Sequence, residues 1–429
     1  MTEPTSRQAE PTRAWVIHPE LTADRARREA RTALDEGVAL AAALPGLVVA
    51  GSEIVRLSRA HPGHLFGTGK IDELKARLKG ADVELVLIDG PVSPVQQRNL
   101  EKAWGVKILD RTGLILEIFS DRARTREGVL QVEMAALSYQ RTRLVRAWTH
   151  LERQRGGLGF VGGPGETQIE ADRRAIDEQL TRLRKQLAKV VKTRELHRAA
   201  RAKVPFPVVA LVGYTNAGKS TLFNRMTGAE VMAKDMLFAT LDPTMRSLVL
   251  PSGRKVILSD TVGFISDLPT QLVAAFRATL EEVLGADVIC HVRDISADQT
   301  EEQARDVETI LESLGVDPDV PMIEVWNKTD RLDPEARAAR ETEAARNPDV
   351  TATSALTGAG LDDLTAAIEA HLANETIRET LHLGFGDGKA RAWLHEAHVV
   401  VAEDQVEDGW ALEVDWTGRQ KAEYAKQAV

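Results

Sequence analysis

The segment from Gly213 to Ser220 limits the fold of this chain more than any other, because it reads GYTNAGKS and fits the pattern GxxxxGKS. A run typical of a buried strand, Val208–Val212, leads into it, and a helix-forming stretch, TLFNRM, follows. Glycines in such a loop let backbone N–H groups turn toward phosphate oxygens at a helix N-terminus. Lys219 is expected to reach the β- and γ-phosphates, and the Ser220 hydroxyl is expected to bind Mg²⁺. The sequence therefore predicts an α/β domain with a nucleotide-binding phosphate loop.

Further segments follow in the order that a guanine-nucleotide domain requires. The strand-like run Val256–Leu258 leads into DTVG, in which Asp260 is expected beside Mg²⁺ and the Gly263 N–H at the γ-phosphate. After MIEVW comes NKTD, which ends in Asp330. Its carboxylate can accept hydrogen bonds from N1–H and the exocyclic amine of guanine, a donor pair that adenine lacks. The ordered set predicts binding and hydrolysis of GTP.

The remaining nucleotide contacts are expected from the base-binding side and from a switch segment. Thr353–Ala355 follows a β-prone run and can present a backbone N–H to guanine O6, and the Lys328 stem can pack on the base. The side chains of Tyr214 and Thr215 need not touch the ligand. The predicted contact residues are Gly213, Tyr214, Thr215, Asn216, Ala217, Gly218, Lys219 and Ser220; Phe238, Ala239, Thr240, Leu241 and Asp242; Asp260, Thr261, Val262 and Gly263; Asn327, Lys328, Thr329 and Asp330; and Ser354, Ala355 and Leu356.

The switch segment FATLDPT, at 238–244, lies between the phosphate loop and DTVG. A switch of this kind needs a threonine whose hydroxyl reports the γ-phosphate through Mg²⁺, and Thr240 and Thr244 both qualify by position. The residue after Gly263 is Phe264, where many GTPases use a glutamine to orient the attacking water. A phenyl ring cannot do this, so hydrolysis is expected to be slow unless another residue or a partner completes the site.

The whole chain is expected to be an α/β multidomain protein, since 429 residues exceed what one core can organise. Before the phosphate loop, strand-like runs at Leu47–Leu57, Val83–Asp89 and Val106–Asp110 alternate with helical stretches at Lys70–Lys79 and Pro94–Trp104, as in a small parallel sheet. The predicted parts are a disordered N-terminus at 1–13, an α/β domain at 14–120, a helical hairpin at 121–203, the GTPase domain at 204–375, and an α+β domain at 376–429 with a helix near Ala390–Ala397 and a strand pair over 398–416.

The predicted hairpin is the one strongly basic part of an acidic chain. Net charge is −9 overall, yet residues 122–203 carry 19 Lys and Arg against 9 Asp and Glu. Apolar residues at a 4-3 spacing on both sides of the glycine-rich Gly156–Gly165 predict two long antiparallel helices. Solvated coiled-coil flanks would explain the charges. We favour RNA contact, because one sign dominates and the loop is half glycine.

The amino-acid composition indicates the cellular compartment that the chain suits. The single cysteine, Cys290, excludes a disulfide framework and a multi-cysteine metal site, which fits a reducing cytosol. No apolar run approaches membrane-spanning length, and the N-terminus lacks the apolar core of a signal peptide. We therefore expect a cytoplasmic monomer without stable membrane insertion; peripheral contact with a membrane stays open.

These motifs together resemble the HflX family of GTPases over nearly the whole chain. The matching segments are GYTNAGKS, FATLDPT, DTVGF and GGPGETQIEADRR, with FGTGKIDEL at 66–74 and LDRTGLILEIF at 109–119. The resemblance implies that Thr240 rather than Thr244 binds Mg²⁺ with Ser220, and that Lys219, Thr240 and Gly263 act in catalysis. The hydrophobic residue after DTVG is itself a trait of this family.

The resemblance also implies a partner. Proteins similar to this one bind the large (50S) ribosomal subunit and its rRNA through the hairpin, dissociate stalled ribosomes under stress, and hydrolyse GTP faster on ribosomes. The chain departs from the family where Val161-Gly162, rather than an arginine, precede Gly163. Some members also bind ATP through the N-terminal domain, but Gly67–Lys70 (GTGK) lacks phosphate-loop spacing. The alternatives are an adaptor whose hairpin binds another protein and, less favoured, a membrane-associated GTPase.

Overall fold

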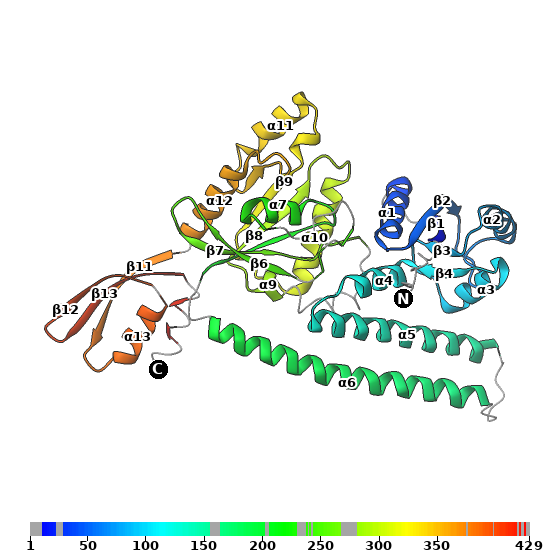
Figure 1. Cartoon of the computed structure of the whole chain (residues 1–429), viewed down its shortest axis with the longest axis horizontal. Coiled ribbons are helices and arrows are strands. Elements are labelled where there is room, and N and C mark those ends of the chain that lie inside the picture. The colour runs from blue at the N-terminus through cyan, green and yellow to red at the C-terminus, as the bar shows by residue number, and fades with distance from the viewer. Residues whose placement is uncertain are drawn as a thin grey trace, which may run out of the picture. The chain divides into compact units, whose positions relative to one another are not determined.

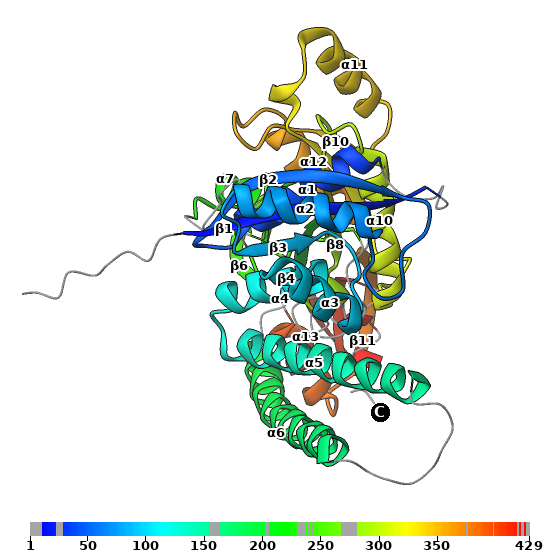
Figure 2. The same cartoon turned by 90° about the vertical axis from the view of Figure 1, so that its right-hand side faces the viewer.

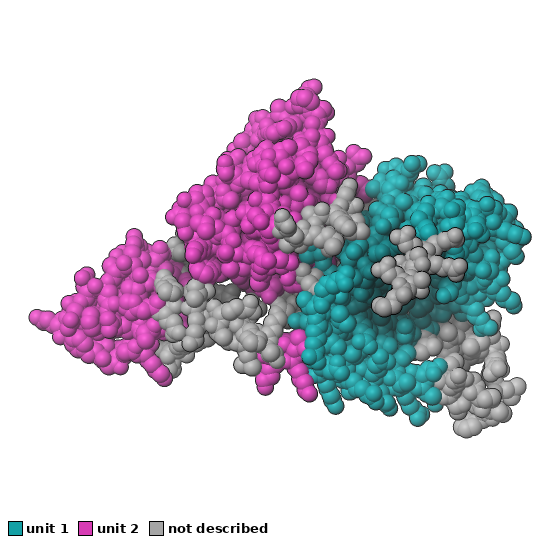
Figure 3. All heavy atoms as spheres, viewed as in Figure 1, with its two compact units in different colours: residues 1–188, 234–241, 267–276 teal, residues 189–233, 242–266, 277–429 magenta. Residues whose placement is uncertain are grey.

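The computed structural model divides the chain into two units, shown in Figure 3. The first comprises residues 1–188, 234–241 and 267–276, and the second comprises residues 189–233, 242–266 and 277–429. The structure describes residues 11–22, 29–154, 164–201, 206–229, 237–238, 240–241, 243–266, 281–374, 376–397, 399–417, 420–421 and 424–425.

The first unit is built on a four-stranded parallel sheet in the order β2-β1-β3-β4, which confirms the predicted α/β domain (Figure 1). Apolar side chains of both the strands and the covering helices form its core, in which Ile17, Leu74 and Leu100 are fully buried. The elements are β1 (Thr12–Leu21), α1 (Ala30–Ala43), β2 (Leu47–Leu57), α2 (Thr68–Gly80), β3 (Leu85–Ile88), α3 (Pro94–Trp104), β4 (Lys107–Asp110) and α4 (Arg111–Arg122).

Local sequence signals explain why two elements begin and end where the sequence predicts. Strand β2 spans the predicted Leu47–Leu57. Helix α3 starts at Pro94 because Ser93 and Gln96 form a reciprocal capping box, and it ends at Gly105, whose φ of 74° is left-handed. The N-terminal boundary differs: β1 already begins at Thr12, because its backbone pairs with Leu47 at the start of β2.

The basic region forms two long helices, α5 (Arg126–Gln154) and α6 (Pro164–Arg201). Arg141 on α5 lies 2.7 Å from Asp177 on α6, and Leu180 and Leu183 are buried. Helix α5 also packs against α3 and α4, as Figure 2 shows. Gln131, Val132 and Ala135 of α5 are also buried.

The second unit holds a six-stranded sheet in the order β10-β9-β8-β5-β7-β6 (Figure 1). Only the β6–β7 pair is antiparallel. The sequence reading did not predict β6, whose residues are mostly half-exposed or exposed. The elements are β5 (Val208–Gly213), α7 (Lys219–Thr227), β6 (Thr244–Val249), β7 (Lys255–Asp260), α9 (Glu281–Leu284), β8 (Val288–Asp294), α10 (Thr300–Leu314), β9 (Met322–Asn327), η1 (Thr329–Arg331), α11 (Pro334–Ala344), β10 (Val350–Ala352) and α12 (Leu361–Asn374).

The C-terminal part is a three-stranded antiparallel sheet in the order β11-β13-β12. It is formed by β11 (Thr376–Gly384), β12 (Val400–Val406) and β13 (Gly409–Thr417), with α13 (Gly388–Glu396) between β11 and β12. The sequence reading missed β11. Trp416 and Leu394 anchor its small core. Within the described residues, no helix is both long and apolar enough to cross a lipid bilayer.

Candidate functional site

The phosphate loop joins the end of β5 to the start of α7. Gly218 closes it with a φ of 96°, and a Cβ at that position would lie 2.3 Å from the side-chain nitrogen of Asn327. The Lys219 side chain turns back over the loop, where Nζ donates to the carbonyls of Gly213 at 2.9 Å and Tyr214 at 2.8 Å. The loop is thereby wrapped around the amino group that is expected at the phosphates.

Lys219 is buried, and this changes its acidity. Burial lowers the pKa of Lys219 to about 8; the charge of Asp260 opposes this shift and that of Lys328 adds to it. A buried ammonium gains more from an anionic partner than an exposed one, because the surrounding dielectric is low. The loop therefore suits a polyanionic ligand.

Ser220 and Asp260 lie together beside the phosphate loop. Ser220 Oγ donates to Asp260 Oδ2 over 2.7 Å, and Asp260 is fully buried at the end of β7. Hydroxyl and carboxylate oxygens suit Mg²⁺, which usually takes one or two protein ligands and completes its shell with phosphates and water. Among the residues that the structure describes, no three His, Cys, Asp or Glu side chains converge as a metal site. The residues present fit a Mg²⁺ that arrives with a nucleotide.

Gly263 lies against the phosphate loop. A Cβ at Gly263 would stand 2.9 Å from Thr215 Cα and 3.1 Å from Lys219 Nζ, so the backbone approaches closely only because the residue is glycine. Thr215 is buried, and its hydroxyl has no hydrogen-bond partner in the described part of the chain. Such a group costs about 1–3 kcal/mol. A phosphate oxygen would satisfy it, which makes the Thr215 hydroxyl a candidate contact, although the sequence did not require this side chain to touch the ligand.

The base-binding side is assembled by Asn327, whose amide joins two loops. Its Nδ2 donates to the Ala217 carbonyl over 2.8 Å, and its Oδ1 accepts from the Ala355 N–H over 2.9 Å. Ser354 Oγ donates to Asp330 Oδ1 over 2.5 Å. The structure therefore brings the phosphate loop, NKTD and the Ser354 loop together in the second unit.

Two side chains beside the base loop were not singled out from the sequence in these roles. Asp294 ends β8 and pairs with Lys328 Nζ over 2.7 Å, which fixes the lysine stem. Ser354 acts through its hydroxyl as well as its backbone. The sequence position of Asp294 could have identified it as a site residue. It ends a buried parallel strand, and ligands bind at the carboxyl ends of such strands.

Some predicted contact residues have side chains that hold the loops. Thr261 Oγ1 donates to the Leu211 carbonyl over 2.6 Å, and Thr329 Oγ1 donates to the Thr353 carbonyl over 3.0 Å. Val262 is buried, whereas Leu356 is 70% exposed. Cys290 and His291 are buried in β8; burial raises the pKa of the thiol to about 12 and lowers that of the imidazole to about 4.

The switch segment is described only in part, because Ala239 and Asp242 lie outside the described residues. Thr240 belongs to the first unit, and there the Phe238 ring packs edge-on against Phe119 of α4 with centroids 4.6 Å apart. Thr244 is the first residue of β6, where it pairs with Asp260 of β7. The glycine-rich tip, at 155–163, likewise lies outside the described residues.

Phe264 is turned into the protein. Its side chain is 1% exposed, and its backbone forms a bridge to the phosphate loop: Thr215 N–H donates to the Phe264 carbonyl over 2.7 Å, and Phe264 N–H donates to the Gly213 carbonyl over 3.1 Å. The side chain at this position therefore has neither a polar group nor the exposure to orient a water.

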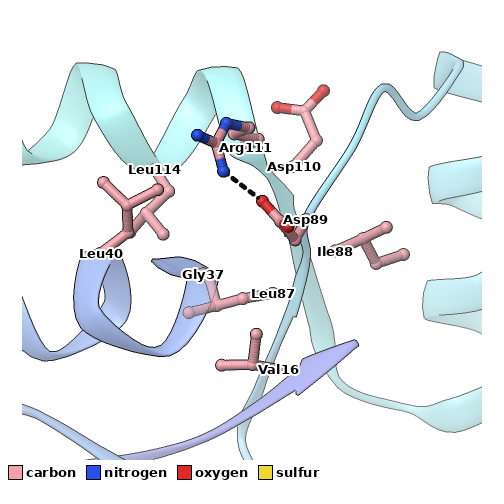
Figure 4. Close-up of a pocket in the computed structure, with 9 residues that line it drawn as sticks. All are labelled: Val16, Gly37, Leu40, Leu87, Ile88, Asp89, Asp110, Arg111 and Leu114. Carbon is pink, nitrogen blue, oxygen red and sulfur yellow. Dashed lines mark hydrogen bonds and ion pairs between the residues drawn. The ribbon is translucent and has the colours of Figure 1, made fainter. Parts of the chain in front are cut away.

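The first unit carries a separate buried charge network. Arg111 lies 2.5 Å from Asp89 Oδ1, the pair drawn in Figure 4. Arg111 also pairs with Glu36, and His18 Nδ1 lies 2.8 Å from Asp89 Oδ2. Burial raises the pKa of Asp89, but the bond from His18 and the charge of Arg111 outweigh it and hold the pKa below its usual value. The adjoining cavity has room for about one water molecule.

The GTGK segment forms no phosphate loop. Gly67 precedes α2, and Lys70 Nζ lies 2.9 Å from Glu53 and 3.1 Å from Glu73. Its ammonium is therefore already paired with carboxylates.

Four segments of the chain match known protein families. Residues 31–120 and 122–201 match the models described as the N-terminal and middle regions of GTP-binding GTPases, residues 208–328 the model described as a 50S ribosome-binding GTPase, and residues 339–428 the HflX C-terminal domain. The GTPase HflX of Magnetococcus marinus is 47% identical over 417 residues, which cover 96% of this chain and 94% of that protein.

The chain belongs to the HflX family.

A second relative, the GTPase HflX of Escherichia coli, is 46% identical over 350 residues, or 81% of each chain. Among solved structures, a GTP-binding protein from Sulfolobus solfataricus in complex with GDP covers 85% of this chain and 99% of its own, at 22% identity and a TM-score of 0.45. Membership in the HflX family and the GTPase domain make the chain a GTPase, which hydrolyses GTP to GDP and phosphate. The predicted family and activity are confirmed.

Proposed function

We propose that this GTPase binds the large ribosomal subunit in its GTP-bound state and promotes the dissociation of ribosomes, with hydrolysis causing its release. The observation that carries the proposal is the burial of Phe264, which leaves this position without a side chain to orient water. In an active GTPase of this kind another residue or a partner must complete the site, and we propose that a partner does so. The match of residues 208–328 to a family described as 50S ribosome-binding supports the large subunit as that partner.

The basic helices α5 and α6 supply a surface for the rRNA phosphate backbone, although not every arginine there is available. Arg143 is mostly buried and pairs with Asp110 at 2.9 Å, so it serves the fold. On α6, the side chain of Arg182 is 77% exposed and Lys185 is also exposed. We infer that the exposed residues of α6 make the RNA contacts, because phosphate contacts need accessible cations.

Within the nucleotide site we assign roles to residues of the second unit from their geometry, and to Thr240 from its match to the switch threonine of the HflX family. Lys219 and Gly263 would hold the γ-phosphate, and Ser220 and Thr240 would bind Mg²⁺, with Asp260 orienting the Ser220 hydroxyl. When bound, Mg²⁺ supplies charge neutralisation for the phosphates. Asp330, held by Ser354, would accept from guanine and reject adenine. Substitution of Lys219 by Ala tests the assignment, since retained GTP turnover would refute it.

Co-sedimentation tests the ribosomal part. The protein should pellet with 50S subunits in the presence of a non-hydrolysable GTP analogue at moderate salt, and should pellet less with GDP. GTP turnover should rise when ribosomes are added. Absence of the protein from the 50S pellet under the first condition would overturn the proposal.

Charge reversal separates RNA contact from protein contact. Arg182→Glu with Lys185→Glu should weaken 50S binding and flatten its salt dependence, because fewer counterions are then released. The matched control is Arg337→Glu with Arg340→Glu on α11 of the GTPase domain, which removes the same charge elsewhere and should leave binding intact. If both double variants lose the same amount of 50S affinity, the total charge of the protein, and not α6, directs binding. If the double variant on α6 keeps its affinity for both 50S subunits and purified rRNA, a hairpin that binds a protein becomes the better explanation.

A further inference from the structure

The side chain of Tyr214 has an environment that its position in the phosphate loop does not require. The residue is 5% exposed. Its hydroxyl oxygen accepts from the Ser266 N–H over 2.8 Å and lies 2.7 Å from Ser266 Oγ. Ser266 Oγ donates in turn to the Asp306 carboxylate on α10. A hydroxyl of the phosphate loop is thus bonded to the segment that follows Gly263.

The donor and acceptor of each hydrogen bond follow from the two groups at the ends of the chain, the Asp306 carboxylate and the Ser266 N–H. The Asp306 carboxylate can only accept when ionised, so the Ser266 hydroxyl donates to it. The Ser266 oxygen is then left to accept from the Tyr214 hydroxyl, and the Tyr214 oxygen accepts from the Ser266 N–H. Each group donates and accepts in one consistent sense, and chains of this kind polarise and strengthen one another.

The same segment is also bound through its backbone. The two bonds between Phe264 and the residues Gly213 and Thr215 lie immediately before the bonds of Ser266 to Tyr214. Together they fix residues 263–266 against the phosphate loop. They hold Gly263 next to the ammonium of Lys219, since a Cβ on Gly263 would be 3.1 Å from Lys219 Nζ. These are the two groups to which we assigned the γ-phosphate.

We propose that Tyr214 is a positioning residue that preorganises Gly263 for the terminal phosphate and thereby raises the preference of the site for GTP over GDP. This inference rests on the proposed roles of Lys219 and Gly263. Without the tyrosine hydroxyl, the segment after Gly263 would have to be ordered when GTP binds, and that cost would appear as lost affinity. GDP lacks the γ-phosphate, so its binding does not draw on Gly263.

The test is Tyr214→Phe in the full chain, which removes one oxygen and keeps the ring. We expect the affinity for a non-hydrolysable GTP analogue to fall about five- to tenfold, with GDP affinity changed by less than about twofold, as the loss of a buried hydrogen bond predicts. The kcat should fall as well. Ser266→Ala breaks the same chain from its other end and should give the same nucleotide-selective loss.

The control is Tyr424→Phe, which removes the equivalent oxygen from a tyrosine packed on Trp393 and Trp416 in the C-terminal domain. It should change neither affinity. If Tyr214 were merely structural, Tyr214→Phe would lower the affinities for both nucleotides equally or change neither. Either outcome overturns the inference. Lys219→Ala distinguishes the two levels of failure: if it retains GTP turnover, the site assignment is wrong; if it loses turnover while Tyr214→Phe is not selective, only the role of Tyr214 is wrong.

Discussion

The side-chain amide of Asn327 donates to the backbone carbonyl of Ala217 over 2.8 Å, and this bond ties the base-binding loop to the phosphate loop. The other end of the same amide accepts from the Ala355 N–H. One buried side chain, 1% exposed, therefore sets the spacing between three loops that must bind the two ends of one ligand.

Asn327→Ala should lower the affinities for GTP and GDP equally, in contrast to Tyr214→Phe. It leaves a buried carbonyl and a buried N–H without partners, so we expect the free energy of unfolding to fall by about 1–3 kcal/mol. Urea unfolding and nucleotide titration measure the two effects. The control is Asn347→Ala, whose exposed side chain accepts from the Asp349 N–H. A loss for GTP alone would contradict the bridging role.

The lowered pKa of Lys219 predicts a pH dependence. Below about pH 8 the free protein holds an ammonium for the phosphates, and above it the amine is neutral. The kcat/KM for GTP should therefore fall as pH rises through about 8. The phosphates in the complex raise the lysine pKa, so kcat should persist to higher pH. Steady-state rates from pH 6.5 to about 10, with circular dichroism to exclude unfolding, check both curves. A flat kcat/KM over this range would show that Lys219 does not titrate there.

Phe264→Gln should not create a faster GTPase. The side chain points into the protein, and the backbone on which it sits is bonded to Gly213 and Thr215. A glutamine there would bury an amide, at a cost of about 1–3 kcal/mol in stability, without reaching the water. Single-turnover hydrolysis should be unchanged or slower, and Phe264→Leu serves as the apolar control. A severalfold acceleration by glutamine alone would refute this reading of the site.

Asp110→Ala should loosen α5 from the N-terminal sheet. The carboxylate accepts from the Gly113 N–H at the start of α4, from Tyr139 at 2.5 Å and from Arg143 at 2.9 Å. Hydrogen exchange in α5 should rise, and Asp110→Asn, which keeps the cap but not the ion pair, should give a smaller effect. Unchanged exchange in both variants would contradict this linkage.

Sequence reasoning succeeded where a local pattern and a tertiary role coincide. The phosphate loop follows a buried strand, and α3 carries its own capping box and terminal glycine. It failed where partners are far apart in the chain. Nothing around Tyr214 indicates that its hydroxyl bonds to Ser266, which donates in turn to Asp306, and Arg143 looks like a solvated flank until Asp110 is placed beside it. Strands β6 and β11 were missed because few of their residues are buried, which weakens the alternation that identifies a strand.

The position of Asp110 also has a mechanical consequence. Helix α5 has 29 residues and is therefore roughly 44 Å long. Asp110 accepts hydrogen bonds from Tyr139 and Arg143, which lie near the middle of the helix, and the same carboxylate caps the start of α4. The helix is thus attached near its middle. A displacement of the middle of α5 would therefore act directly on the carboxylate that joins the end of β4 to the start of α4.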